Sequence, residues 1–355
     1  MAVLLAALLP TLLHAQPVVR HPDPATPLAE RWNWGMQTAK ASCQQGCWIG
    51  YSIQRWMAPD SYTGWHTDRR SPLPTLQMLV YGREVEPILD RRTVGRRAVV
   101  NENVLKEVAL LFRLDPNDQT IRDVKISNIS LRVDLEGRPL TWLGVSDQVE
   151  SIPVLEKQYA RTESAESKEA LVVAVGIHDV GELIAPFLIS IVESGEPEDV
   201  RKQAVFWLAE ADDPKVLPAL ERTVRRDASD EVRKQAVFGI SRIDTPPAED
   251  LLIDLARNLE DHETREQAIF WLGQKASEKA VAGLSEIVEN DPDVEIQKKA
   301  VFAISQLPED EGVPRLIDIA RTHRNPKVRQ NAIFWLGESG DPRAVDVLVE
   351  IVRGK

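Results

Sequence analysis

Cysteine is scarce in this sequence of 355 residues, which contains only Cys43 and Cys47. A structural zinc site needs four ligands, and the nearest histidine, His66, offers no recognisable metal-binding spacing. We therefore expect no bound metal and interpret the pair either as a small structural disulfide loop or as two free thiols. A disulfide requires that the pair lie off a regular helix, because two cysteines four residues apart on a helix point poorly for bonding.

Long apolar runs are also nearly absent. After residue 15, no stretch approaches the roughly 18 consecutive apolar residues of a membrane-spanning helix, so we expect no membrane span. Residues 1–15 (MAVLLAALLPTLLHA) are apolar but too few to span a bilayer, and they end in a small residue, as a secretory signal does. We predict a signal peptide over 1–15 and a periplasmic or secreted protein. The alternative is a mis-chosen start codon ahead of a cytosolic protein, because the expected basic start is missing.

Positive charge is in deficit, and the deficit lies in the second half of the chain. The net charge is -12, and residues 166–355 carry 24 Lys and Arg against 37 Asp and Glu. Nucleic-acid binding depends largely on cations placed against phosphates. We therefore expect no nucleic-acid partner.

The same acidic half contains five segments that recur every 32 residues. Alanine and phenylalanine are in strict register in all five, at positions such as Ala204 and Phe206. The segments read VRKQAVFWL from Val200, VRKQAVFGI from Val232, TREQAIFWL from Thr264, IQKKAVFAI from Ile296 and VRQNAIFWL from Val328. A period of this length predicts stacked helical hairpins, each of which buries its apolar face against its neighbours. We expect this α-solenoid over residues 166–355, with a divergent capping repeat over 168–194.

The first half predicts a different architecture. Proline-rich residues 16–28 suggest an extended linker, and residues 29–145 a small β-rich (α+β) domain in which five of the nine tryptophans fall between Trp32 and Trp65. A connecting helix over 146–165 follows, capped by Ser146 or Asp147. The strands of an antiparallel sheet are expected at Cys47–Trp56, Leu76–Tyr81, Glu107–Leu114, Ile121–Ile126 and Leu131–Asp134.

The repeat resembles a known family. The pattern Val-Arg-x-x-Ala followed by leucine, and then Gly-Asp-Pro opening a second amphipathic helix at Gly340, is similar to the short bacterial HEAT repeat, also called the phycobilisome-lyase-like repeat. The resemblance implies an all-α HEAT-like solenoid for the C-terminal half. It leaves function open, because such repeats serve scaffolds, lyases, hydroxylases and sorting factors alike.

Catalytic motifs are missing. The sequence has no G-x-S-x-G nucleophile motif and no phosphate-cradling glycine loop. Hydroxylases built on similar repeats hold two irons with paired His-Glu steps, but His262-Glu263 is the only such step here. Neither His178-Asp179 nor His323 completes a set. We expect a protein that is not an enzyme and needs no cofactor.

An aromatic residue stands where the related repeats place a polar one. On a helical wheel, Val200, Ala204 and Leu208 share an apolar arc, and Phe206 falls nearly opposite. One interpretation is a stripe that binds an extended or helical segment of another protein; the other is a ridge of core rings shared by adjacent repeats. The candidate partner-binding residues are Phe206, Phe238, Phe270, Phe302 and Phe334, the amides Gln203, Gln235 and Gln267, and Trp207, Trp271 and Trp335.

The tryptophans have a second interpretation of their own. Trp207, Trp271 and Trp335 alternate with Gly239 and Ala303, which favours interlocking packing of large and small residues over a direct ligand role. The recurring arginines are expected to satisfy acidic turn residues of the neighbouring unit. They are Arg201, Arg233, Arg265 and Arg329.

These features predict a non-catalytic scaffold or adaptor of the cell envelope that binds a protein partner along its repeat helices. The alternative is a regulatory or substrate-docking subunit of an envelope enzyme, with carbohydrate contact through the tryptophan-rich segment, whose aromatics could instead be core. A basic cluster in the first domain is either a solvated loop or a docking site for an anionic surface. It consists of Arg91, Arg92, Arg96 and Arg97.

Overall fold

The chain forms two compact units. A computed structural model describes residues 17–64, 73–83 and 103–353, with unit 1 ending at Leu183 and unit 2 beginning at Ile184. The predicted signal peptide at 1–15, Trp65, His66 and the basic cluster at 91–97 lie outside the described residues. The boundary comes later than the expected solenoid start at residue 166, because α4 (Ala165–Gly176) packs on α3 (Gln148–Tyr159) and on the sheet strand β4 (Ile121–Asn128).

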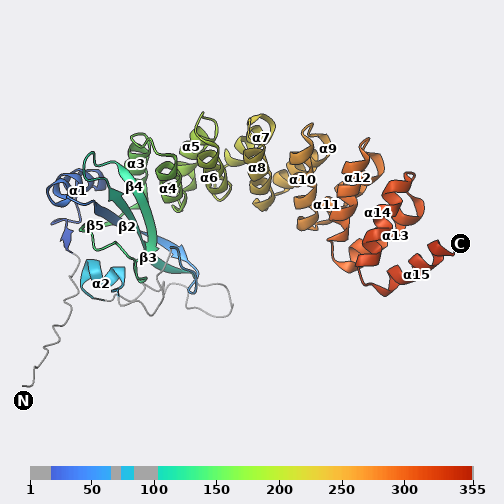
Figure 1. The fold of residues 1–355 in the computed structure, drawn as a ribbon, viewed down its shortest axis with the longest axis horizontal. Helices are drawn as coiled ribbons and strands as arrows, with labels where there is room; N and C mark the ends of the chain where they lie inside the picture. Colours follow the sequence, from blue (N-terminus) through green and yellow to red (C-terminus); the bar gives the residue numbers. More distant parts are fainter. Residues whose placement is uncertain (1–16, 65–72, 84–102, 354–355) are drawn as a thin grey trace, which may run out of the picture. The chain divides into compact units, whose positions relative to one another are not determined.

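Unit 1 is built on a five-stranded sheet with the order β1-β5-β2-β3-β4 (Figure 1). Strands β2, β3 and β4 pair antiparallel, whereas β5 runs parallel to both β1 and β2. The sheet is therefore mixed, not antiparallel throughout as predicted, because it includes two strands that were not predicted, β1 and β5. The bounds are β1 Val18–Arg20, β2 Cys47–Met57, β3 Val104–Leu114, β4 Ile121–Asn128 and β5 Leu140–Ser146.

Other expectations for unit 1 need correction. Residues Leu76–Tyr81 form a helix, α2, whose first turn is capped by Thr75, and not a strand. The segment at 131–134 is not one of the five sheet strands, and its Arg132 forms an isolated bridge with Thr75, the residue before α2. The predicted linker at 16–28 holds β1 and leads into an unpredicted helix, α1 (Leu28–Ser42). The helix predicted after Ser146 is confirmed as α3, capped by Asp147.

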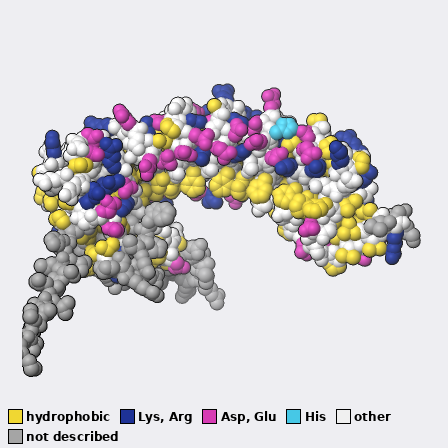
Figure 2. All heavy atoms as spheres, in the orientation of Figure 1, with side chains coloured by type: hydrophobic (Ala, Val, Ile, Leu, Met, Phe, Trp, Pro, Cys, Tyr) yellow, Lys and Arg dark blue, Asp and Glu magenta, His cyan; other side chains and the backbone are white. Residues whose placement is uncertain are grey.

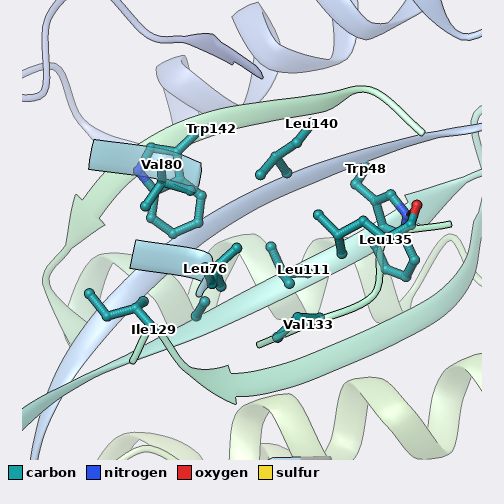
Figure 3. Close-up of a cluster of buried hydrophobic side chains, with 10 residues drawn as sticks. Trp48, Leu76, Val80, Leu111, Ile129, Val133, Leu135, Leu140 and Trp142 are labelled. Atoms are coloured by element: carbon teal, nitrogen blue, oxygen red, sulfur yellow. Dashed lines mark hydrogen bonds between the residues drawn. The ribbon is translucent and has the colours of Figure 1, made fainter. Parts of the chain in front are cut away.

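Each face of the sheet buries its own apolar layer. On one face, Trp48, Leu111 and Trp142 meet Leu76 and Val80 of α2, as the close-up in Figure 3 shows. On the other face, Tyr51 of β2 stacks on Phe112 of β3, and Trp32 of α1 meets both rings edge-on. Strand alternation explains the division, because successive side chains point to opposite faces.

Cys43 and Cys47 form a disulfide in the structure. Cys43 follows the last residue of α1 and Cys47 begins β2, so the pair spans the turn between the two elements. The geometry is accessible because the cysteines do not share a helix. The bond ties α1 to the strand whose apolar face α1 covers.

Unit 2 consists of helices stacked in series in two layers (Figure 1). The phenylalanine-bearing helices contact one another in sequence and form the first layer: α6 Glu198–Ala209, α8 Asp230–Arg242, α10 His262–Lys275, α12 Val294–Ser305 and α14 Pro326–Glu338. The second helix of each hairpin forms the other layer: α7 Val216–Arg226, α9 Pro246–Asn258, α11 Glu278–Asn290, α13 Glu309–Thr322 and α15 Pro342–Val352. Helix α5 (Gly181–Val192) precedes them and crosses the boundary between the units.

A buried hydrogen-bond chain joins three elements of unit 1. The Ser151 hydroxyl on α3 lies 2.7 Å from the Tyr51 hydroxyl and 2.8 Å from Nε2 of His178, just after α4. Nδ1 of His178 lies 3.0 Å from the carbonyl oxygen of Val175. Burial lowers the pKa of His178 to about 4, because the charged imidazolium cannot be solvated there.

This burial predicts an acid-sensitive unit 1. Unfolded His178 titrates near its ordinary pKa of about 6.5, so between that pH and about 4 the unfolded chain binds the extra proton. The His178 contribution is therefore complete above about pH 6.5 and is lost as the pH falls through this window, by at most about 3 kcal/mol. Urea unfolding at several pH values, monitored by the hydrogen exchange of peptides from β2, measures this loss of stability.

A matched pair of variants isolates His178. His178→Asn should flatten the pH dependence, whereas His262→Asn, at an exposed position on α10, should preserve it. An unchanged pH slope in His178→Asn would contradict the assignment.

Candidate partner-binding surface

The buried face of each first-layer helix leaves its phenylalanine outside. In α6, Val200, Ala204 and Leu208 are fully buried, as their counterparts are in the later repeats. Phe206 lies opposite this arc on the 3.6-residue period, with 36% of its surface exposed. The local pattern that drives the hairpins to stack therefore also presents the ring.

The five rings are exposed unequally. Phe270 is 36% and Phe334 is 54% exposed, similar to or above Phe206, whereas Phe238 and Phe302 are half-buried. Exposed and half-buried rings thus alternate from one repeat to the next. The structure fits neither a uniform open track nor a sealed core.

The alternation follows from the tryptophans. The Trp271 ring lies 4.8 Å from Phe238 of the preceding repeat and 5.0 Å from Phe270 of its own. Trp335 repeats the arrangement, 4.9 Å from both Phe302 and Phe334. Each tryptophan therefore covers the ring before it and supports the ring beside it, as interlocking packing predicts. The Trp207 ring lies 5.3 Å from Phe206 of its own repeat, and Ala174 stands one repeat before Phe206.

Small residues occupy the contacts between the tryptophans. A Cβ atom added to Gly239 of α8 would lie 3.0 Å from the Cβ of Ala209 of α6. A Cβ added to Gly273 of α10 would likewise lie 3.0 Å from the Cβ of Ala303 of α12. These helix pairs have no room for an indole at the shared contact. Narrow and tryptophan-filled contacts therefore alternate along unit 2.

We define the aromatic stripe as the five phenylalanines and three tryptophans, and amide side chains lie beside it. Gln203, Gln235 and Gln267 are half-buried, and their side chains make no hydrogen bond within the part of the chain that the structure describes. Lys299 takes the next place and pairs with Glu266 at 2.7 Å. In the last repeat, the Oδ1 atom of Asn331 is buried and has no partner among the described residues. The stripe is therefore flanked by amides with unused hydrogen-bonding capacity.

Charged side chains near the stripe are paired between repeats. Glu210 and Arg242 lie 2.7 Å apart, and so do Lys234 and Glu263. The hydrogen bond to Glu263 raises the pKa of Lys234. Figure 2 shows the result on one face of unit 2, where a band of hydrophobic side chains runs beside interspersed acidic and basic ones.

The recurring arginines are structural, as expected. Arg201 donates two hydrogen bonds to Asp227, at 3.1 and 2.9 Å, in the turn before the next repeat. Arg233 reaches Asp261 at 3.2 Å, and Arg265 pairs with Asp291 while both are buried. Arg329 differs, because it donates to the backbone carbonyl oxygens of residues 323 and 324.

Other candidate residues are not assembled into a site. Trp32 and Trp48 are buried in the core of unit 1, so they offer no face to a sugar, while Trp56 is 45% exposed. His262 faces Asp293 at 3.5 Å. Within the described ranges, no group of three or more His, Cys, Asp or Glu residues could hold a metal ion. No described helix combines the length and apolarity needed to cross a membrane.

Two-helix repeats that bury their apolar faces only against neighbouring repeats define unit 2 as an α-solenoid. The family profile described as HEAT repeats matches residues 185–273, 249–322 and 281–355. Residues 185–355 therefore consist of HEAT repeats. Solenoids of this kind present extended binding surfaces, so the family indicates a protein-interaction scaffold.

Three solved structures illustrate the likeness. Escherichia coli YibA is 19% identical with a TM-score of 0.35, covering 57% of this chain and 76% of that one. The CpcE–CpcF complex of phycocyanin lyase from Nostoc sp. PCC7120 is 21% identical with a TM-score of 0.22, covering 53% and 98%. Human deoxyhypusine hydroxylase is 19% identical with a TM-score of 0.24, covering 56% and 76%. These TM-scores are low, so the identification rests on the family profile. No curated protein sequence matches the chain.

The packing predicts that two neighbouring aromatic residues contribute unequally to the stability of unit 2. Trp271→Ala removes the indole between Phe238 and Phe270 and should destabilise unit 2 by about 3 kcal/mol. Phe270→Ser removes an exposed ring with one edge-on aromatic contact and should cost about 1 kcal/mol or less. Urea denaturation followed by far-ultraviolet circular dichroism measures both. Equal losses would show that Phe270 belongs to the core.

Proposed function

We propose that unit 2 is a non-catalytic adaptor that binds a protein partner along the aromatic stripe. The observation that carries the proposal is the exposure of Phe206, Phe270 and Phe334 at equivalent positions of every second repeat. Exposed apolar surface of this extent is uncommon without a partner, and aromatic anchors beside polar groups are typical of binding hot spots. Within the stripe, Trp271 and Trp335 cover the half-buried rings Phe238 and Phe302, whereas these three exposed rings are left open to a partner.

The chemistry of the stripe favours protein over the other classes of partner. Acidic side chains outnumber basic ones across residues 166–355, which opposes a phosphate backbone. The rings are distributed over five repeats, so they fit an elongated partner better than a compact small molecule.

We place the protein in the cell envelope as part of the same proposal. The apolar start of the chain supports export, and the Cys43–Cys47 disulfide supports an oxidising compartment. An adaptor there would hold its partner outside the cytoplasm.

Cell fractionation tests the location. The full chain, tagged at its C-terminus, should appear in the envelope or secreted fraction with Cys43 and Cys47 resistant to alkylation until reduced. A version that begins at Gln16 should stay in the cytosol with both thiols alkylated. Cytosolic full-length protein with free thiols would refute the location.

Site-specific photo-crosslinking tests the stripe. Phe270→benzoylphenylalanine places a crosslinker among the exposed rings and should yield a discrete adduct in cells of the source organism. Asp346→benzoylphenylalanine places the same group at an exposed position of the second layer and should yield none. Adding Phe206→Ser and Phe334→Ser to the first variant should reduce the adduct at least about fivefold.

The control decides the interpretation. Equal adducts from Phe270 and Asp346, or an adduct unaffected by the two serine substitutions, would place binding elsewhere.

A further inference from the structure

The exposed rings of the aromatic stripe have a period of two repeats, not one. Phe206, Phe270 and Phe334 are 64 residues apart in sequence, and the rings between them lie against Trp271 and Trp335. Packed helices lie about 8–10 Å apart, so successive exposed rings are separated by roughly 16–20 Å. A partner that contacts all three needs anchors at that spacing.

The amides beside the stripe indicate which backbone conformation the partner presents. Gln203, Gln235 and Gln267 recur once per repeat and have no side-chain hydrogen bonds among the described residues. An amide both donates and accepts, which matches the N–H and C=O groups of a peptide. A helix pairs these groups internally, whereas an extended chain leaves them free. The amides therefore favour an extended partner.

The charged flanks indicate the charge of the partner. Ion pairs between repeats join Glu210 to Arg242, Lys234 to Glu263 and Lys299 to Glu266, each at 2.7 Å. Within α6, Lys202 pairs with Asp199 at 2.9 Å. Lys202 also lies near Glu198, and Lys234 also pairs with Glu231. Each of these charges already has a partner of opposite sign, so the surface offers no unpaired charge to a charged segment and suits a segment without net charge. A strongly basic or acidic segment would have to break pairs that already exist.

We propose that the partner binds as an extended, uncharged segment whose large apolar side chains recur about every six residues. This inference rests on the proposed adaptor function. An extended chain advances about 3.1–3.3 Å per residue, so about six residues span the distance between exposed rings. Each repeat then faces about three partner residues, and its amide can meet one of their backbone groups.

Synthetic peptides test the spacing directly. A fluorescein-labelled Ser/Thr/Gly peptide with three leucines about six residues apart should bind the full chain at least about tenfold more tightly than one with leucines about four apart. It should also bind more tightly than a helical Ala/Glu/Lys peptide with leucines about eleven residues apart, which spans a similar distance. Fluorescence anisotropy measures all three.

Variants and salt test the contacts. Phe206→Ser with Phe270→Ser and Phe334→Ser should abolish binding, and Gln203→Ala with Gln235→Ala and Gln267→Ala should weaken it about tenfold. Asp346→Ala should have no effect. Because the partner carries no net charge, raising NaCl from about 0.05 to 0.5 M should change the affinity less than about twofold.

The outcomes separate this inference from the proposed function. Preference for the helical peptide or the four-residue spacing, strong salt dependence, or no binding by any peptide overturns the extended uncharged segment. In those cases a crosslink from Phe270 would still support the adaptor. The absence of a crosslink from Phe270 would instead contradict the proposed adaptor function, whatever the result of the peptide binding.

Discussion

The separation of neighbouring repeats depends on the residue that follows each phenylalanine. Where it is tryptophan, as at Trp271 and Trp335, the indole fills the contact and lies on the ring of the preceding repeat. Where it is Gly239 or Ala303, the helix packs closely on the preceding first-layer helix. A Cβ atom added at Gly239 or at Gly273 would lie only 3.0 Å from the Cβ of Ala209 or Ala303, respectively. Close packing tolerates neither an indole in the narrow contact nor a void in the wide one. This alternation sets which rings are covered and which reach solvent.

Polar interactions hold the rest of the solenoid in register without using the stripe. The arginine near the start of α6 reaches the turn that precedes α8, and the pairs Arg233–Asp261 and Arg265–Asp291 repeat the link. These bonds satisfy the turns between hairpins, which would otherwise leave carboxylates and carbonyl groups unpaired. These links lie at the turns, so they leave the exposed phenylalanines of the first-layer helices available to a partner.

The sequence predicted unit 2 better than unit 1, for physical reasons. A residue such as Ala204 that recurs every 32 positions predicts both a helix and the packing of that helix on the next repeat, because every hairpin buries the same face. In unit 1, Leu76–Tyr81 is too short for its period to distinguish a helix from a strand. The parallel pairing of β5 joins segments distant in the chain, and no local pattern records it.

The stripe was predictable in part. The helical wheel places Phe206 and Phe238 identically, yet the structure exposes the first and half-buries the second. The difference comes from Trp271, a residue of the following repeat. Alternation of Trp with Gly and Ala was visible in the sequence, but which ring each indole covers depends on the distance and direction between helices.

The alternation also constrains how such a chain can change in length. Ala209, Gly273 and Gly337 share one position of the tryptophan-bearing helices, and Ser241 and Ser305 hold it in the others. Deleting or duplicating one hairpin would bring two bulky contacts, or two narrow ones, next to each other. Gain or loss of hairpins in pairs would keep every contact matched. The structural unit of this solenoid is therefore a pair of hairpins, 64 residues long, twice the length of the sequence repeat.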